Sequence, residues 1–133
     1  MDDLPSHGAF VERAYEEACA LLVDARDYIA GASAEDGKGL APGDRLRLTL
    51  EMSRLTRRLT EVTAWLMLQK GVAAGEITRD RAATTAAAQM ADGDPGAASD
   101  DAALLRLPLV ARGLIDRARR LHAHVAGLRA SLG

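Results

Sequence analysis

The chain has 133 residues, among them 27 alanines and 19 leucines, but nine valines and isoleucines together and four aromatic residues. Strands are stabilised by branched and aromatic side chains, so this composition excludes a β-rich fold and predicts one all-helical domain that covers residues 1–133. The single cysteine excludes a disulfide framework, and a net charge of −2 without a leader or a long apolar run predicts a soluble cytoplasmic protein.

The charges are distributed unevenly along the chain. Residues 1–36 carry nine acidic and two basic side chains, residues 37–103 carry nine of each, and residues 104–133 carry six arginines and one acid. We expect the acidic first helix to lie beside the basic last helix of the same molecule. A nucleic-acid site needs a basic face without a matching acidic segment, and aromatic side chains for stacking. We therefore expect no nucleic-acid partner.

The first predicted helix covers residues 9–30 and has a wide apolar face. The members of this face are Ala14, Tyr15, Ala18, Leu21, Leu22, Ala25, Tyr28 and Ile29. Glycines and a proline between residues 31 and 43 predict that the helical pattern stops there.

The second predicted helix covers residues 44–74, with Asp44 as its candidate N-cap and Gly75 as the residue that ends it. Apolar residues recur along it at alternating spacings of four and three, which places all of them on one helix face. They are Leu48, Met52, Leu55, Leu59, Val62 and Leu66.

The C-terminal half of this helix is apolar on its flanks as well, and such a helix needs neighbours on more than one side. The flanking residues are Ala64, Trp65, Met67, Leu68 and Val72. A second copy of the chain would cover them, so we predict a homodimer. We assign to the core or the dimer interface Leu55, Leu59, Val62, Trp65, Leu66 and Leu68. The alternative is that the next segment folds back over this face.

That next segment, residues 79–90, is a possible short helix, and residues 91–101 are predicted to form a mobile loop. The last long helix is predicted over residues 104–131, and it repeats the apolar stripe of the second. The expected fold is therefore an all-α, three-helix bundle of long antiparallel helices that dimerises through helix faces.

Histidine and cysteine residues do not form a site in the sequence. His122 and His124 are two positions apart on a predicted helix, so their side chains point about 200° apart and cannot share a metal ion. Cys19 has no basic or histidine neighbour in sequence that would activate its thiol. We therefore expect no metal, no cofactor and no catalytic residue.

Three arginines, Arg47, Arg54 and Arg58, lie on one side of the second predicted helix. Some all-helical dimeric mutases bind dicarboxylates with arginines from long helices, so the alternative function is a small-molecule-binding dimer or an enzyme that uses this stripe. Glu51 between two of the arginines, and Glu61 one turn beyond the third, instead indicate a salt-bridged surface that faces solvent. The residues alone therefore predict an interaction protein rather than an enzyme.

Three stretches are similar to a known family. Residues 54–78 (RLTRRLTEVTAWLMLQKGVAAGEIT) resemble the signature of the regulator of CtrA degradation family, a group of small alphaproteobacterial helical proteins that are mostly uncharacterised. Residues 15–29 (YEEACALLVDARDYI) and 121–129 (LHAHVAGLR) resemble its first and last helices. The motif residues that match are Arg54, Thr56, Arg57, Trp65, Gln69 and Glu76.

The resemblance implies a dimeric three-helix bundle without catalysis. The characterised member of the family helps to deliver the cell-cycle regulator CtrA to the ClpXP protease, together with other adaptor proteins and often at a cell pole. By this resemblance we expect a non-enzymatic adaptor whose partners are protease-delivery adaptors and a regulatory substrate. Arg54, Arg57 and Arg58 are assigned to a partner-facing surface, and no membrane partner is expected.

Overall fold

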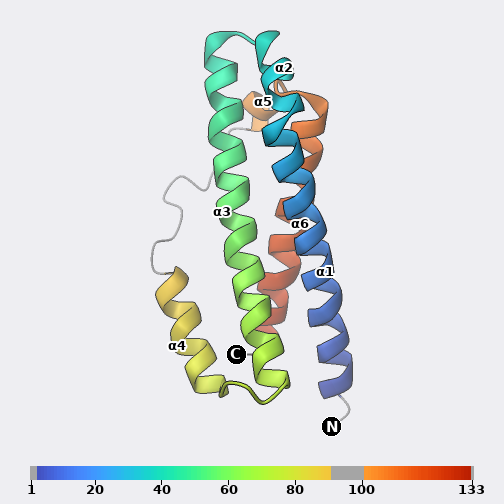
Figure 1. Cartoon of the computed structure of the whole chain (residues 1–133), viewed down its shortest axis with the longest axis vertical. Coiled ribbons are helices and arrows are strands. Elements are labelled where there is room, and N and C mark those ends of the chain that lie inside the picture. Colours follow the sequence, from blue (N-terminus) through green and yellow to red (C-terminus); the bar gives the residue numbers. More distant parts are fainter. Residues whose placement is uncertain (1–2, 91–100, 133) are drawn as a thin grey trace.

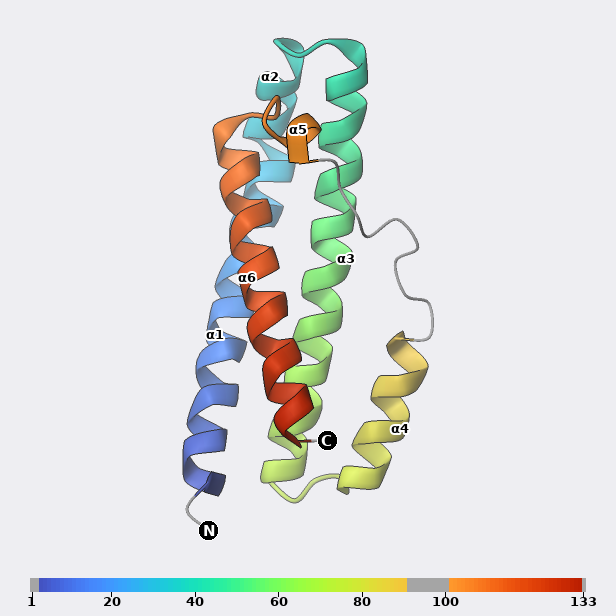
Figure 2. The same ribbon diagram turned by 180° about the vertical axis from the view of Figure 1, so that it is seen from behind.

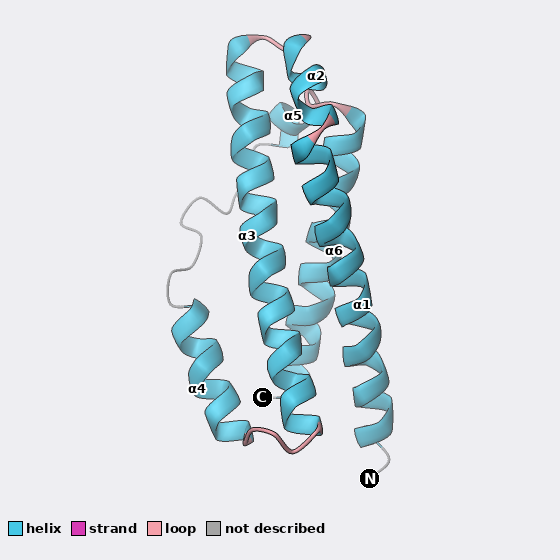
Figure 3. Cartoon of the chain, viewed as in Figure 1, coloured by secondary structure: helices cyan, strands magenta, loops and turns pink. Residues whose placement is uncertain are grey.

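The computed structural model describes residues 3–90 and 101–132, and the regular structure in these two ranges is entirely helical. The helices are α1 (Asp3–Ala30), α2 (Ala32–Lys38), α3 (Pro42–Ala73), α4 (Arg79–Met90), α5 (Asp101–Leu104) and α6 (Leu109–Leu132). The three long helices α1, α3 and α6 pack side by side, and α4 lies along one end of α3 (Figures 1 and 2). The predicted all-α bundle is therefore confirmed, and Figure 3 shows the loops that join its helices.

The direction of each long helix follows from the length of its connections. Helix α1 runs antiparallel to both α3 and α6, while α3 and α6 run in the same direction (Figure 1). The segment that joins α1 to α3, residues 31–41, is short. A connection of this length is enough to join two antiparallel helices that are neighbours. Residues 74–108 separate α3 from α6, and a connection of that length allows the two helices to lie parallel.

The core lies between the three long helices and consists of their apolar stripes. Leu21 from α1, and Leu59 and Leu66 from α3, are the largest fully buried side chains in the described part of the chain. The α3 stripe identified in the sequence is buried throughout. Each leucine contributes roughly 1.5–3 kcal/mol when it is buried, so these stripes are the main source of stability.

Helix α1 begins at Asp3, earlier than the expected residue 9, because Pro5 is tolerated in a first helical turn. The segment after it, expected to break the helical pattern, contains the short helix α2. The Tyr28 hydroxyl donates a hydrogen bond of 2.7 Å to Asp36 Oδ2, which ties α2 to α1. From α3, Arg45 Nε donates to the carbonyl oxygen of Gly37 at 3.1 Å. Side chains from both long helices therefore hold α2 in place.

A tight turn after α3 directs α4 back along that helix. Gly75 has a φ of +75°, a conformation that favours glycine, and Glu76 N donates to Gly71 O at 2.9 Å. The Thr78 Oγ1 atom accepts a hydrogen bond of 3.2 Å from Arg81 N and so caps the first turn of α4. These contacts explain why the chain reverses direction within a few residues.

Helix α4 supplies much of the cover that the apolar end of α3 requires. It packs against α3 and buries Ala82 and Ala86. Trp65 is 6% exposed and Leu66 is fully buried within the single chain, whereas Met67 is 56% exposed. The alternative in which residues 79–90 fold back is therefore what the structure shows, and a second copy is not needed to bury Trp65.

The start of the last helix differs from the expected residue 104. A one-turn helix, α5, ends at Leu104, and α6 begins at Leu109 just after Pro108. The residue before a proline is disfavoured in the helical conformation, which accounts for the interruption. Of the predicted mobile loop over residues 91–101, residues 91–100 lie outside the described part of the chain, and Asp101 is the first residue of α5.

Ion pairs join the long helices at the bundle surface. Arg117 of α6 lies 3.0 Å from Asp24 of α1, which is the type of contact expected between the basic last helix and the acidic first one. Lys70 of α3 lies 3.2 Å from Glu12 of α1. All four side chains are 38–51% exposed, so each pair contributes less than about 1 kcal/mol.

Candidate protein-interaction site

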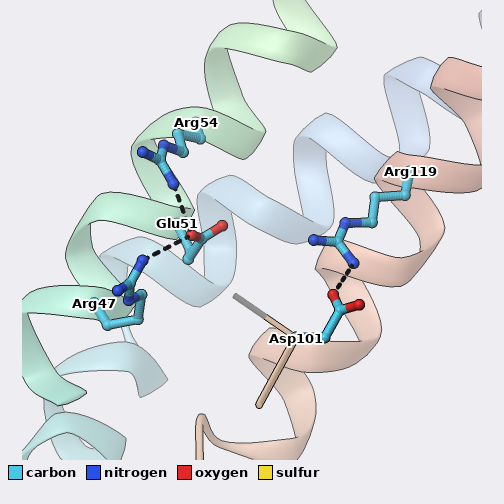
Figure 4. Close-up of polar contacts among 5 residues, drawn as sticks. All are labelled: Arg47, Glu51, Arg54, Asp101 and Arg119. Carbon is cyan, nitrogen blue, oxygen red and sulfur yellow. Dashed lines mark hydrogen bonds and ion pairs between the residues drawn. The ribbon is translucent and has the colours of Figure 1, made fainter. Parts of the chain in front are cut away.

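The predicted arginine stripe of α3 surrounds a glutamate (Figure 4). Arg54 Nη1 donates to Glu51 Oε1 at 3.0 Å, and Arg47 Nη1 lies 3.9 Å from the same oxygen. Figure 4 also shows a second ion pair, in which Arg119 Nη1 of α6 lies 3.4 Å from Asp101 Oδ1 of α5.

Glu51 is buried, contrary to the expectation of a solvent-facing surface. Its side chain is 5% exposed, compared with 21% for Arg54 and 33% for Arg47. Glu51 lies three positions after Leu48 and four before Leu55, so it belongs to the edge of the buried stripe. Helix packing therefore covers a carboxylate that the local sequence pattern assigned to the surface.

The three arginines assigned to a partner-facing surface do not lie together. Arg54 bonds to Glu51 on one flank of α3, whereas Arg57 Nε lies 3.5 Å from Glu61 Oε1. Arg57 also lines a groove on the α1 side of α3, and Arg58 lies close enough to His122 of α6 to influence its titration. The assigned residues thus face three different surroundings.

The groove beside Arg57 is formed by α1, α2 and α3 and has a volume of about 720 Å³. Its apolar part includes Ile29, Leu48 and Met52. A second hollow of about 430 Å³ shares Ile29 and Thr56 with it and continues along α1 to Leu22 and Val23. The two hollows adjoin each other at these shared residues, and we call them together the α1–α3 groove.

The α1–α3 groove is open because its α3 side carries small hydroxyl residues. Thr49, Ser53 and Thr56 line it. Thr56 Oγ1 donates to the Met52 carbonyl oxygen at 2.9 Å, and Thr49 Oγ1 donates to the Arg45 carbonyl oxygen at 3.3 Å. These hydroxyls bond to their own helix, and their short side chains leave the groove unfilled. In the sequence, the row of small hydroxyl residues along α3 was the available signal for this groove.

The large groove does not support the alternative function as an arginine-based enzyme. Its basic lining residues are Arg26, Arg45 and Arg57 rather than Arg47, Arg54 and Arg58. Arg47 and Arg54 are directed to a buried carboxylate instead. In the described part of the chain, no group of three or more histidine, cysteine, aspartate or glutamate side chains is arranged to hold a metal ion.

A smaller hollow between α3 and α6 contains Trp65, Glu61 and His122. The guanidinium of Arg129 lies 5.9 Å from the centre of the Trp65 ring, within the range of a cation–π contact. Partial burial in this hollow lowers the pKa of His122 below its ordinary value of 6.5, and the nearby Arg58 and Arg129 lower it further, although Glu61 acts in the opposite direction. His122 is therefore favoured in its neutral form.

The lowered pKa of His122 predicts a pH dependence of stability. Below pH 6.5 the unfolded chain takes up a proton that folded His122 resists, so stability is full above this pH and falls as the pH drops through the lowered pKa. We expect the free energy of unfolding of the wild type to decline below pH 6.5 more steeply than that of His122→Gln. Urea unfolding of both proteins between about pH 5 and pH 8 measures the difference. Parallel pH profiles would contradict this assignment.

The fold and the site define a class of protein, an all-helical bundle with an open apolar groove and charged side-chain clusters. Among the described helices, none is long and apolar enough to cross a bilayer. The chain belongs to the DUF1465 family, described as a protein of unknown function, whose model matches residues 5–132.

The comparison with solved structures gives a named relative. The chain is similar to RcdA from Caulobacter crescentus, with 29% sequence identity and a TM-score of 0.67 over 90% of this chain and 88% of that one. No curated protein sequence matches the chain. The expected membership of the regulator of CtrA degradation family is therefore confirmed.

Proposed function

We propose that this protein is a non-enzymatic adaptor in regulated proteolysis that helps to deliver a regulatory substrate, CtrA or a protein like it, to the ClpXP protease. The observation that carries this proposal is the likeness to RcdA, which extends over nine tenths of the chain at 29% identity. Similarity of this extent supports a regulatory adaptor role.

An adaptor works by holding two partners at once. Binding a substrate through one surface and a protease-delivery factor through another converts their encounter into an intramolecular step and raises their effective concentration. A rigid bundle suits this task, because its packed core keeps the surfaces at constant separation. Arg57 and Arg58 are the proposed partner contacts, together with Arg54 at the edge of the same helix.

We also assign the adaptor a homodimeric state, which would present each surface twice. Apolar side chains remain exposed on α3 and support a contact between copies, namely Leu46 at 71%, Leu50 at 42% and Met67 at 56%. Sedimentation equilibrium of the purified chain tests this state, and a monomer mass would exclude it.

A reconstituted degradation reaction tests the adaptor role. With ClpXP, its other delivery adaptors and CtrA, we expect the chain to accelerate CtrA loss several-fold. Arg57→Glu/Arg58→Glu should lose most of the acceleration, because two proposed contacts are reversed in charge. Arg112→Glu/Arg120→Glu on α6 carries the same change of charge elsewhere and should remain active. An unchanged rate in the presence of the wild-type chain would exclude the proposed function.

A further inference from the structure

We propose that the α1–α3 groove is the docking site for an acidic, amphipathic helix of a partner protein. This inference rests on the proposed function in one respect, namely that an adaptor needs a surface on which a partner protein docks. Binding to the groove is measured without a protease, so its failure is distinct from failure of the adaptor role.

The dimensions of the groove match a short helix. Its α3 lining extends from Arg45 to Arg57, and at 1.5 Å per residue this is about 18 Å of helix axis. A partner helix of about twelve residues, or a little over three turns, would occupy that length. The hollow continues past Thr56 along α1 to Val23, so the depression follows the helix axes rather than forming a closed pit.

The surface chemistry of the groove is that of a helix-binding site. Buried Leu48 and Met52 form its apolar floor, and Val23 and Ile29 at its edge are 44% and 42% exposed. A partner helix buries apolar residues at positions i, i+3 or i+4, and i+7 in grooves of this kind. The small Ser53 on the α3 side allows the partner backbone to approach closely.

The charges around the groove identify the partner as acidic. Three arginines line the two hollows, namely Arg26, Arg45 and Arg57, whereas neither lining includes an acidic residue. Arg45 donates hydrogen bonds to the uncharged carbonyl oxygens of Gly37 and Leu40, so its positive charge is available to a carboxylate. Arg26 lies 3.6 Å from Asp27, but both side chains are at least 67% exposed, and such a pair is weak. Arg57 lies 3.5 Å from Glu61, so its charge is partly compensated and the attraction for a carboxylate comes mainly from Arg45 and Arg26. Complementary charge directs association toward an acidic partner.

The same charges argue against a second copy as the occupant. A symmetric dimer places the same patch of both copies against each other. Two α1–α3 grooves face to face would bring the arginines of both copies together, and like charges in an interface cost several kcal/mol. The homodimer proposed above would therefore use a different face.

The probe is a displayed library of short helical peptides. Leucine is placed at the positions of one helix face, and glutamate, glutamine or lysine is varied at all others. Selection against the wild-type chain is expected to enrich peptides with an excess of glutamate. Enrichment of neutral or basic peptides, or no enrichment over an empty support, would overturn the proposal.

Two pairs of variants locate the binding of the best peptide by fluorescence anisotropy. Thr56→Trp fills the groove and should weaken binding at least tenfold, while Thr84→Trp on α4 is its control. Both threonines are exposed, and each donates a 2.9 Å hydrogen bond to the carbonyl four residues earlier. Equal affinity for the two variants would overturn the assignment of the site.

The charge variants separate electrostatic attraction from apolar contact. Arg26→Gln/Arg57→Gln should weaken binding and reduce its dependence on salt, because two attractive charges are removed. Arg112→Gln/Arg120→Gln on α6 makes the same change of net charge and should bind as the wild type does. If the peptide instead dissociates a dimer in sedimentation experiments, the groove is an interface between copies and the proposal is wrong.

Discussion

Replacing Trp65 with alanine is expected to lower the free energy of unfolding by about 3–5 kcal/mol, the largest effect of any single substitution considered for this chain. The Trp65 side chain is 6% exposed and points from α3 toward α6. There the guanidinium of Arg129 lies 5.9 Å from the centre of the indole ring. Truncating Trp65 to alanine removes a large buried aromatic side chain. The cavity that remains is filled only in part, because the surrounding helices are already closely packed. Urea denaturation followed by circular dichroism measures the loss.

Met67→Ala is the matched control for this prediction. Met67 is two positions further along α3 and is 56% exposed, so its truncation should change stability by less than about 1 kcal/mol. Similar losses for the two variants would show that Trp65 is not packed in the solution structure. Repeating the measurement over a range of protein concentrations also tests whether one chain suffices to bury Trp65. If a second copy were needed, the stability would rise with protein concentration.

Replacing Arg54 with methionine is expected to destabilise the fold by about 2–4 kcal/mol, although the arginine itself is at the bundle edge. The cost arises at its partner, because Glu51 is 5% exposed and loses a 3.0 Å hydrogen bond from a charged donor. Arg47 lies 3.9 Å away and compensates only in part. A buried carboxylate with weakened partners is a larger penalty than the lost contact alone.

A double variant distinguishes this explanation from a general loss of packing. Glu51→Leu/Arg54→Met should be more stable than Arg54→Met alone, because the buried charge is removed together with its partner. Arg57→Met is the surface control, since Arg57 and Glu61 are 46% and 26% exposed, and it should cost less than about 1 kcal/mol. If the double variant is less stable than Arg54→Met, the buried charge of Glu51 does not cause the loss of stability in the single variant.

Much of the fold could be predicted because the signals for helices are local. The four-and-three spacing from Leu48 to Leu66 predicted the stripe that the structure buries, and Gly75 marked the end of α3. Proline accounts for three helix starts that differed from expectation. Pro5 allowed α1 to begin early, α3 begins at Pro42 with Ala41 rather than Asp44 as its N-cap, and Pro108 separates α5 from α6. The spacing of apolar residues and the residues that form turns act over a few positions. A single segment of the chain therefore determines where each helix begins and ends.

The candidate site was less predictable because burial at the edge of a stripe depends on distant segments. Glu51 was expected on the surface, whereas the structure buries it, and Arg54 and Arg57, both assigned to a partner-facing surface, pair with different carboxylates. The α1–α3 groove was not predicted at all. It exists because α1 and α2 meet α3 beside small residues such as Ser53, and no local pattern reports that meeting.

The sequence by itself determined that this protein is a helical bundle of its family, because apolar periodicity and a continuous motif specify helices and kinship without reference to distant contacts. Only the tertiary structure decided which surfaces remain open. Helix α4 packs against α3, a carboxylate is enclosed between arginines, and an apolar groove lined by three arginines remains exposed. These outcomes depend on how helices far apart in the chain pack against one another, which no local pattern in the sequence reports.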